Sequence, residues 1–319
     1  MMANAEPKPV IKQTSTTRKS SFYSSQKYFP WFLIAPTLLV IGLVVLYPML
    51  YSIYVSFTPF HLLRPEKTFV FATDTMFRNY VRLAGDDVFW RSLRNTVIFL
   101  AASVNISFVV ALAISQLLAR VTKGQALMRT LLMVPMMFAP VLVGFQFAWF
   151  FNATVGLVNN GLLSLGILTE PKAWLVDQPT GMMALIIAAI WMNVPVMSII
   201  LLAGTLSLPR ETYEAAEVDG ANSWQQFKFV TLPLLQPFII IALTVLSLDL
   251  ARAYDIVRIM TGGGPAHRTE MIWTYAGRLA IRNSQFGMAS AMSMVGVVLG
   301  VLFTLYLFRQ LMKSREVLQ

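Results

Sequence analysis

The chain alternates between long stretches without any Asp, Glu, Lys or Arg and shorter stretches where charged residues gather. A helix that crosses the hydrocarbon core of a bilayer needs about 20 consecutive, mostly apolar residues. Six uncharged stretches reach that length: residues 28–63, 95–119, 130–169, 178–209, 229–248 and 283–308. The pattern therefore predicts an all-α integral membrane protein with six transmembrane helices in a domain of residues 28–310.

The third stretch is too long for one span, so we place its helix at residues 130–151. Residues 152–179 contain several Gly, Asn and Pro and predict an external loop with a short interfacial helix. The first stretch has no small-residue cleavage site closing a short apolar region, so we expect a retained helix rather than a signal peptide. Residues 1–27, rich in Ser, Thr, Lys and Pro, predict a disordered tail. Residues 311–319 form a second predicted tail.

Composition and charge agree with a membrane location. Of the 319 residues, 56% are hydrophobic and only 13% are charged, against about 25% charged in soluble domains. The net charge of +10 could suggest nucleic acid. However, the basic residues mostly flank apolar stretches, so topology and anionic lipid headgroups explain them more simply. Cysteine is absent, which excludes disulfides and thiolate metal sites.

The distribution of Lys and Arg predicts the orientation. The two sides of the membrane carry nearly equal numbers, but the positive-inside rule acts mainly in short loops and near the ends of spans. Residues 120–129 and the tail from Arg309 hold several basic residues, whereas the loop 152–179 holds only Lys172. We therefore expect both termini, and the loop between the fourth and fifth spans, to be cytoplasmic.

That loop, residues 207–236, has a specific spacing of small, acidic and turn-forming residues. Small Ala215 and Ala216 would let another protein approach a short helix closely, and Glu214 would offer it charge. Gly220 permits the positive φ that ends a helix. We expect Pro233 to restart the chain in the first turn of the next helix. An ordinary amphipathic surface helix is the alternative.

The spacing resembles the EAA loop of permease subunits from binding-protein-dependent ABC importers. Three further features favour the carbohydrate-uptake, maltose-type (type I) branch: the residues flanking the EAA spacing, the Thr-Gly-Gly-Gly-Pro turn of residues 261–265, and the Phe-Gly-Met-Ala-Ser sequence of residues 286–290. The resemblance implies a type I ABC importer permease fold in the bacterial cytoplasmic (inner) membrane. It also implies ATPase-coupling roles for Glu214, Ala215, Ala216, Asp219, Gly220, Ala221, Leu232 and Pro233.

The resemblance further implies the partners. These are a second, different permease subunit, an ABC ATPase dimer that grips the EAA loops, a periplasmic solute-binding protein, and membrane lipid. The chain has no Walker-type sequence, so hydrolysis would belong to a separate subunit and drive alternating access. We expect no catalytic residue, cofactor or metal, because His61 and His267 are far apart in sequence and no acid/base groups converge.

Polar groups inside the spans are candidates for the substrate path, because each costs free energy unless it has a partner or faces water. Asn193 lies on the fourth span near Pro195, which would loosen that helix, and Asp249 and Arg252 lie on the fifth. In the maltose-type family the matching stretches contact the sugar. The expected substrate path comprises Gln146, Trp191, Met192, Asn193, Leu246, Asp249, Arg252 and Ala253.

Several alternatives stay open at this point. Asp249 and Arg252 are three positions apart on one helix face and could pair with each other. Trp191 could pack in the core or stack on a sugar ring. The solute could be something other than a sugar, and Arg252 leaves an anion possible. An ion-coupled secondary transporter would need membrane carboxylates and inverted repeats, and only Asp249 meets that requirement.

Overall fold

The computed structural model describes residues 22–64, 76–177 and 179–317, which form helices and turns without any strand. Two units make up the chain, with the division after Ser52. The elements, with η for 3-10 and π turns, run α1 (Phe22–Ile41), η1 (Gly42–Leu46), α2 (Tyr47–Ser56), α3 (Arg78–Ala84), α4 (Asp87–Arg120), α5 (Gln125–Met133), η3 (Val134–Met137), α6 (Pro140–Phe150), α7 (Leu157–Ser164), α8 (Thr180–Leu206), α9 (Arg210–Val218), α10 (Ser223–Gln226), η4 (Phe227–Thr231), α11 (Leu232–Ala251), α12 (Asp255–Met260), η5 (Pro265–His267), α13 (Ile272–Gly277), η6 (Arg278–Arg282) and α14 (Phe286–Val317).

Five helical segments of the described chain are long and apolar enough to cross a membrane. They are Phe29–Ser56, Asp87–Arg120, Thr180–Leu206, Ser223–Ala251 and Phe286–Phe303. Each overlaps one of the six uncharged stretches, because a charged side chain is what ends a stable segment in hydrocarbon. Five of the six predicted spans are therefore present as single helices.

The predicted third span, residues 130–151, is not one straight helix. Its two halves, Gln125–Met137 and Pro140–Phe150, meet at 89°. Ala139 at the break is extended, with φ −64° and ψ 140°, because the ring of Pro140 disfavours the helical conformation in the residue before it. Pro135 removes a further backbone donor just upstream. The pair is either a broken span or a re-entrant segment.

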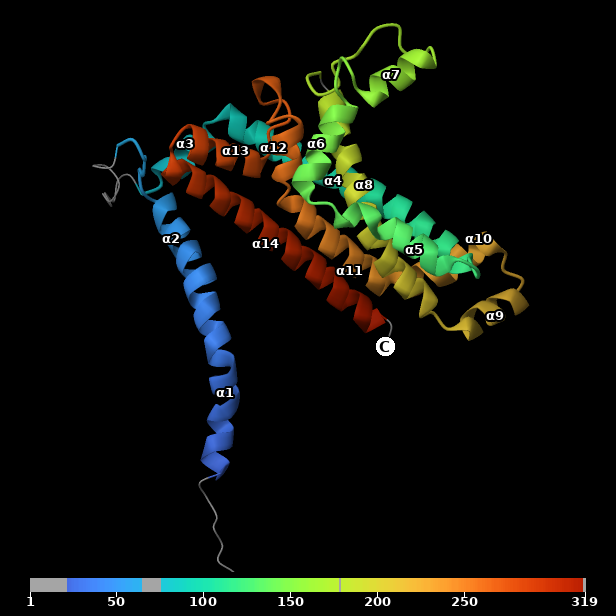
Figure 1. Cartoon of the computed structure of the whole chain (residues 1–319). Helices are drawn as coiled ribbons and strands as arrows, with labels where there is room; N and C mark the ends of the chain where they lie inside the picture. The colour runs from blue at the N-terminus through green and yellow to red at the C-terminus, as the bar shows by residue number, and fades with distance from the viewer. Residues whose placement is uncertain (1–21, 65–75, 178, 318–319) are drawn as a thin grey trace, which may run out of the picture. The chain divides into compact units, whose positions relative to one another are not determined.

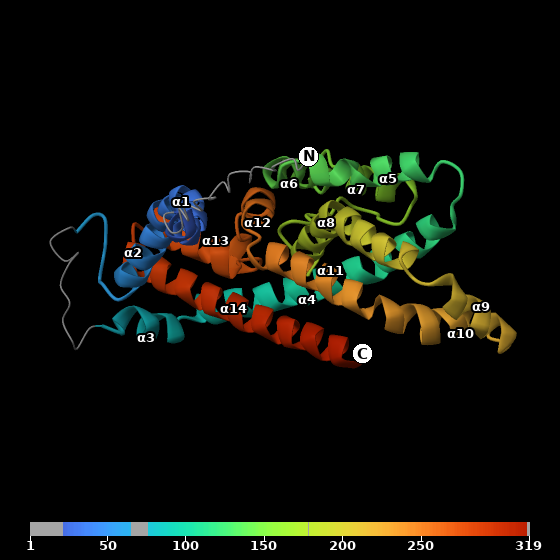
Figure 2. The same cartoon turned by 90° about the horizontal axis from the view of Figure 1, so that it is seen from below.

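The second unit is built around the packing of α4 on α8. A row of small residues at every fourth position of α4, Ser103, Ser107, Ala111 and Ser115, is completely buried. Small side chains let helix backbones approach closely, which is how membrane helices associate where no water drives them together. Both cartoon views show α4, α8, α11 and α14 running side by side in this unit (Figures 1 and 2).

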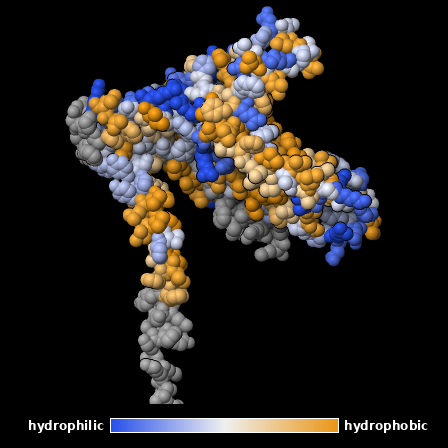
Figure 3. Space-filling view, viewed as in Figure 1, coloured by the Kyte–Doolittle hydropathy of each residue, from blue (hydrophilic) through white to orange (hydrophobic). Residues whose placement is uncertain are grey.

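Short helices and loops lie at the two ends of this bundle. The α9–α10 segment is at one end, and α3, α13 and the loop after α12 are at the other (Figure 1). In the space-filling view hydrophilic residues gather at both ends, and hydrophobic residues cover the helices between them (Figure 3). This distribution is the one expected of a protein that spans a bilayer.

Both predicted tails include helical residues in the described part of the chain. Residues 22–27 belong to α1 and residues 311–317 to α14, while residues 1–21 and 318–319 lie outside the described residues. Residues such as Leu311, Met312 and Lys313 have high helix propensity, so α14 continues beyond the uncharged stretch. The predicted loop 152–179 contains α7, the expected short helix.

Candidate functional site

The loop of residues 207–236 contains α9, a helix of nine residues with a defined end. Gly220 has φ +78°, and its N–H donates to the carbonyl of Glu217 at 3.0 Å. The Ala221 N–H donates to the carbonyl of Ala216 at 2.9 Å. These two bonds form a Schellman motif, which requires a left-handed residue after the helix. The turn predicted for Gly220 is present.

The residues predicted to couple to an ATPase fall into two groups. Six lie together on α9 and its turn, where Glu214, Ala215, Asp219 and Gly220 are exposed and Ala216 and Ala221 are half-buried. Leu232 and Pro233 lie apart from them, in the first turn of α11. Val218 leaves 88% of its surface exposed, so α9 presents an apolar side chain as well as carboxylates to whatever approaches it.

Few contacts hold α9 on the bundle. The hydroxyls of Tyr213 and Thr231 are 2.9 Å apart and join α9 to the segment that leads into α11. Just before α9, the last turn of α8 lies tightly on α11: a methyl group on Gly204 would come within 2.5 Å of the Phe238 ring. The Gln116 amide donates to the Thr205 hydroxyl at 2.9 Å, which ties α4 to the same turn. The position of α9 therefore depends on the packing of α8 and α11.

Pro233 lies in the first turn of α11, as predicted, but the chain does not restart a separate helix there. Residues Ser223–Ala251 form one continuous helix, which begins with a capping box between Asn222 and Gln225. The helix widens into the π turn η4 immediately before Leu232 and Pro233. A proline ring inside a helix clashes with the carbonyl four residues earlier, here that of Phe229, and a π turn relieves such a clash. The first unit repeats the arrangement, with η1 two residues before Pro48.

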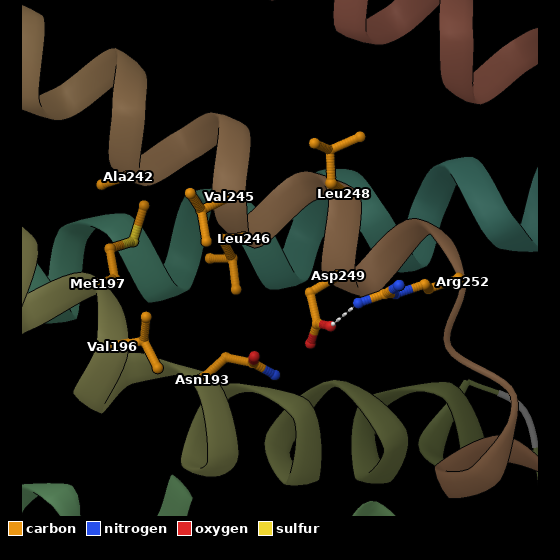
Figure 4. A pocket seen from close by; sticks show the side chains of 9 residues that line it. All are labelled: Asn193, Val196, Met197, Ala242, Val245, Leu246, Leu248, Asp249 and Arg252. Atoms are coloured by element: carbon orange, nitrogen blue, oxygen red, sulfur yellow. Dashed lines mark hydrogen bonds and ion pairs between the residues drawn. The ribbon is translucent and has the colours of Figure 1, made fainter. Parts of the chain in front are cut away.

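A cavity of about 440 Å³ lies between α8 and α11. Asn193 on α8 points toward α11, where Asp249 and Arg252 lie close together (Figure 4). Leu246 adds an apolar wall. A second cavity of about 300 Å³ shares Asp249 and Arg252 and adds Met192 and Ala253. The structure thus brings six of the eight residues predicted for a substrate path to two neighbouring cavities.

The two remaining residues lie elsewhere. Trp191 packs between aromatic rings, with its ring centre 5.6 Å from that of Phe147 and 6.1 Å from that of Phe138. Of the two roles left open for Trp191, core packing and stacking on a sugar ring, the structure therefore shows packing. Gln146 lies half-buried on α6 and lines neither cavity.

The polar side chains of the first cavity already form a hydrogen bond and an ion pair within the protein. The Asn193 amide nitrogen donates to the carbonyl of Ala189 in its own helix at 2.9 Å, so this donor does not bridge two helices. Asp249 and Arg252 form an ion pair at 3.2 Å, with side chains 46% and 75% exposed. An exposed pair of this kind contributes at most about 1 kcal/mol. A ligand hydroxyl could therefore replace either partner at little cost.

Sequence reasoning missed the apolar residues that complete the first cavity, among them Met197, Ala242 and Val245. Only their spacing could have indicated them, because each lies four positions from Asn193, Leu246 or Asp249 on the same helix face. Among the described residues, no three His, Asp or Glu side chains gather as a metal ligand set would.

Comparisons with known proteins agree with this architecture. Residues 107–312 match the family model "Binding-protein-dependent transport system inner membrane component". The chain is 32% identical over 275 residues to the trehalose/maltose transport system permease protein MalF of Thermococcus litoralis, covering 86% of this chain and 90% of the relative. It is also 32% identical to the lactose transport system permease protein LacF of Rhizobium radiobacter, over 95% and 99% of the two chains.

A solved structure has the same fold. It is the bacterial alginate ABC transporter in complex with an alginate pentasaccharide-bound periplasmic protein, one chain of which matches with a TM-score of 0.75 and 20% identity. The match covers 91% of this chain and 96% of that one. The present chain belongs to the family of inner-membrane permease components of binding-protein-dependent ABC importers, which have no catalytic activity of their own.

Proposed function

We propose that this chain is one of two different permease subunits of an ATP-driven importer for a sugar or sugar derivative. Its relatives carry names of trehalose/maltose and lactose transport systems. The α8–α11 cavity fits that class, because its apolar walls carry an amide, a carboxylate and a guanidinium. Sugars are bound by groups of this kind, which donate to and accept from hydroxyls. Asn193, Asp249 and Arg252 are the residues we assign to substrate contact.

The observation that carries the proposal is the connection between the cavity and the loop. The helices α8 and α11 line the cavity, and the exposed α9 joins them at one end of the bundle (Figure 1). An ATPase that gripped α9 could therefore change the separation of α8 and α11 without touching the substrate. Two ATPase subunits would hold one such loop each, one on this chain and one on the second permease.

The proposed cycle is alternating access. ATP closes the ATPase dimer, the loops move with it, and the cavity opens toward a docked solute-binding protein; hydrolysis resets the complex. The coupling free energy needed between the two sites is of the order of 1–3 kcal/mol. In this arrangement the 207–236 loop and both termini are cytoplasmic. Among the described residues, Asp249 is the one carboxylate that lines the first cavity, and Asp255 joins it in the second.

The test is charge reversal at Glu214. The complex of this chain, its partner permease, the ATPase dimer and the solute-binding protein would be reconstituted in lipid vesicles. We expect Glu214→Lys to abolish both uptake and the stimulation of ATPase activity by the loaded binding protein. Thr212→Lys, at an exposed position on the opposite face of the same helix, is the matched control and should retain both. If Glu214→Lys left uptake and stimulation unchanged, the role assigned to α9 would be wrong.

A further inference from the structure

The loop of residues 261–271, at the end of the bundle opposite α9, is built around a buried carboxylate. We propose that this loop is a preformed docking surface for the solute-binding protein, and that Glu270 holds it in shape. The inference rests on the proposed function, because that function places the 261–271 loop on the external side of the membrane, opposite the cytoplasmic α9. It assigns a role to the Thr-Gly-Gly-Gly-Pro turn, which the cavity between α8 and α11 does not use.

Glu270 is completely buried although it lies in a loop. Its Oε2 atom is 2.5 Å from Nη2 of Arg278 and 2.9 Å from Nδ1 of His267. The same Arg278 nitrogen donates to the carbonyl of Gly262 at 2.9 Å. A buried ion pair rarely stabilises a fold more than apolar packing would. We therefore infer that the Glu270–Arg278 pair serves to fix the conformation of the loop rather than to stabilise the fold.

The three glycines are needed because the turn wraps closely around this pair. Gly262, Gly263 and Gly264 have φ of +61°, +92° and +69°, a region that residues with a Cβ atom rarely adopt. A methyl group on Gly263 would lie 2.7 Å from Oε2 of Glu270 and 2.8 Å from Nη2 of Arg278. Glycine at this position is thus required by both the backbone and the ion pair.

Hydrogen bonds fix the loop to the start of α4. The Asn95 amide donates to the carbonyls of Arg268 and Glu270 at 2.9 and 3.0 Å. Arg91 donates to the carbonyl of Ala266 at 2.7 Å. Just after the loop, the Ile272 N–H donates to the hydroxyl of Thr96 at 3.1 Å. The loop and the first turns of α4 therefore form one rigid body.

A hydrogen bond between Tyr275 and Asp86 attaches α13 to the N-cap of α4. The hydroxyl of Tyr275 donates to the carboxylate of Asp86, which also accepts the N–H of Val88 as the N-cap of α4. Burial raises the pKa of Tyr275, and the bond to Asp86 raises it further. The hydroxyl therefore keeps its proton and remains a donor at any physiological pH.

The tip of the loop is held in a strained, exposed conformation. Ala266 and His267 have φ of +51° and +60°, a conformation that costs free energy in residues other than glycine. Such strain persists only where the surroundings fix the backbone, and it often marks a binding segment. Pro265, Ala266 and Arg268 are exposed at this tip, so the fixed backbone presents side chains outward.

The charge around the tip indicates the chemistry of the partner surface. In α3, the first turns of α4 and residues 261–283, the exposed charged side chains are Arg78, Arg82, Asp87, Arg94, Arg268 and Arg282. Five of these six are arginines, which favour a carboxylate-rich protein face. The family to which the chain belongs depends on a binding protein. We therefore infer an acidic face on the solute-binding protein as the occupant.

The experiment uses the reconstituted complex and measures ATPase activity against the concentration of loaded binding protein. Gly263→Ala disturbs the loop from within, and Arg268→Glu reverses the charge of an exposed side chain at its tip. We expect each to raise the concentration for half-maximal stimulation about tenfold or more, with the maximal rate and the basal rate retained. Gly124→Ala is the matched control for backbone strain, because Gly124 also has a positive φ of +79° but faces open space. It should leave the curve unchanged.

Glu270→Gln tests the positioning role of the carboxylate, and it should shift the half-maximal concentration in the same direction. If Gly263→Ala or Glu270→Gln failed to assemble, Arg268→Glu would still decide the question. A direct readout is also available, because the chain has no cysteine. A single Arg268→Cys variant carrying a photo-activated crosslinker should capture the binding protein.

The outcomes separate the docking proposal from the function on which it rests. If the wild-type complex shows no stimulation by the loaded binding protein, the proposed function fails. If stimulation is present and lost in Glu214→Lys, but Gly263→Ala and Arg268→Glu leave the half-maximal concentration unchanged, only the docking surface is wrong. Absence of a crosslink from residue 268 in an active complex would also overturn it.

Discussion

Gly204→Ala should weaken both the fold and the coupling of this permease, because Gly204 packs tightly against α11 in the last turns of α8 before α9. The added methyl group would lie 2.5 Å from Cγ of Phe238 and 2.8 Å from Cδ1 of Leu235. Ordinary contact begins near 3.4 Å, so α11 would have to move by about 0.9 Å, the difference between 3.4 and 2.5 Å. Leu235 is completely buried and Phe238 is a ring, so neither can simply swing aside.

Overpacking of this kind costs about 1–3 kcal/mol, and replacing glycine by alanine in a helix offsets up to about 1 kcal/mol. With the full offset we expect a net loss of up to about 2 kcal/mol, seen as a lower Tm of the purified complex. The displacement of α11 also shifts α9, so fewer solute molecules should be imported for each ATP hydrolysed. Gly161→Ala is the control, because Gly161 lies in a helix with nothing within 4 Å of an added methyl. If the two variants had the same Tm and the same ratio of solute to ATP, the dependence of α9 on α8–α11 packing would be refuted.

Three further substitutions test the loop and the cavity. Tyr213→Phe removes the hydroxyl bonded to Thr231, costs about 0.5–1.5 kcal/mol, and should lower the transport-to-ATPase ratio while the ATPase subunits stay bound in pull-down. Asn193→Ala should raise the KM for solute uptake severalfold without changing assembly; loss of assembly would indicate a structural role instead. Asp249→Asn removes one charge of a largely exposed ion pair, so Tm should change by less than the equivalent of about 1 kcal/mol while uptake falls. Normal uptake in that variant would exclude Asp249 from substrate contact.

The spans and the α9 turn were predictable because their signals are local. A charge-free stretch is a direct consequence of the cost of charge in hydrocarbon, and Gly220 ends α9 through the conformation that glycine alone adopts easily. Helix periodicity places Asp249 and Arg252 on one face of the fifth span, but that this face and Asn193 line one cavity was implied only by the family resemblance.

The features that were not predicted depend on tertiary contacts. Pro135 and Pro140 indicate that the third span is irregular, but the 89° bend depends on what packs against each half. Pro233 looked like a helix start, yet the π turn before it lets one helix continue. Nothing in the local sequence indicates that Glu270 is buried, and its burial follows only when the three-glycine turn folds back over Arg278.

The most direct measurement is solute uptake into lipid vesicles containing defined sets of subunits. We expect uptake only when this chain is present with its partner permease, the ATPase dimer, external binding protein and internal ATP. Vesicles containing this chain alone should show none, with or without an ion gradient. Uptake by this chain alone, or uptake that continued without ATP, would contradict the role of α9 as the link between nucleotide hydrolysis and the transport cavity.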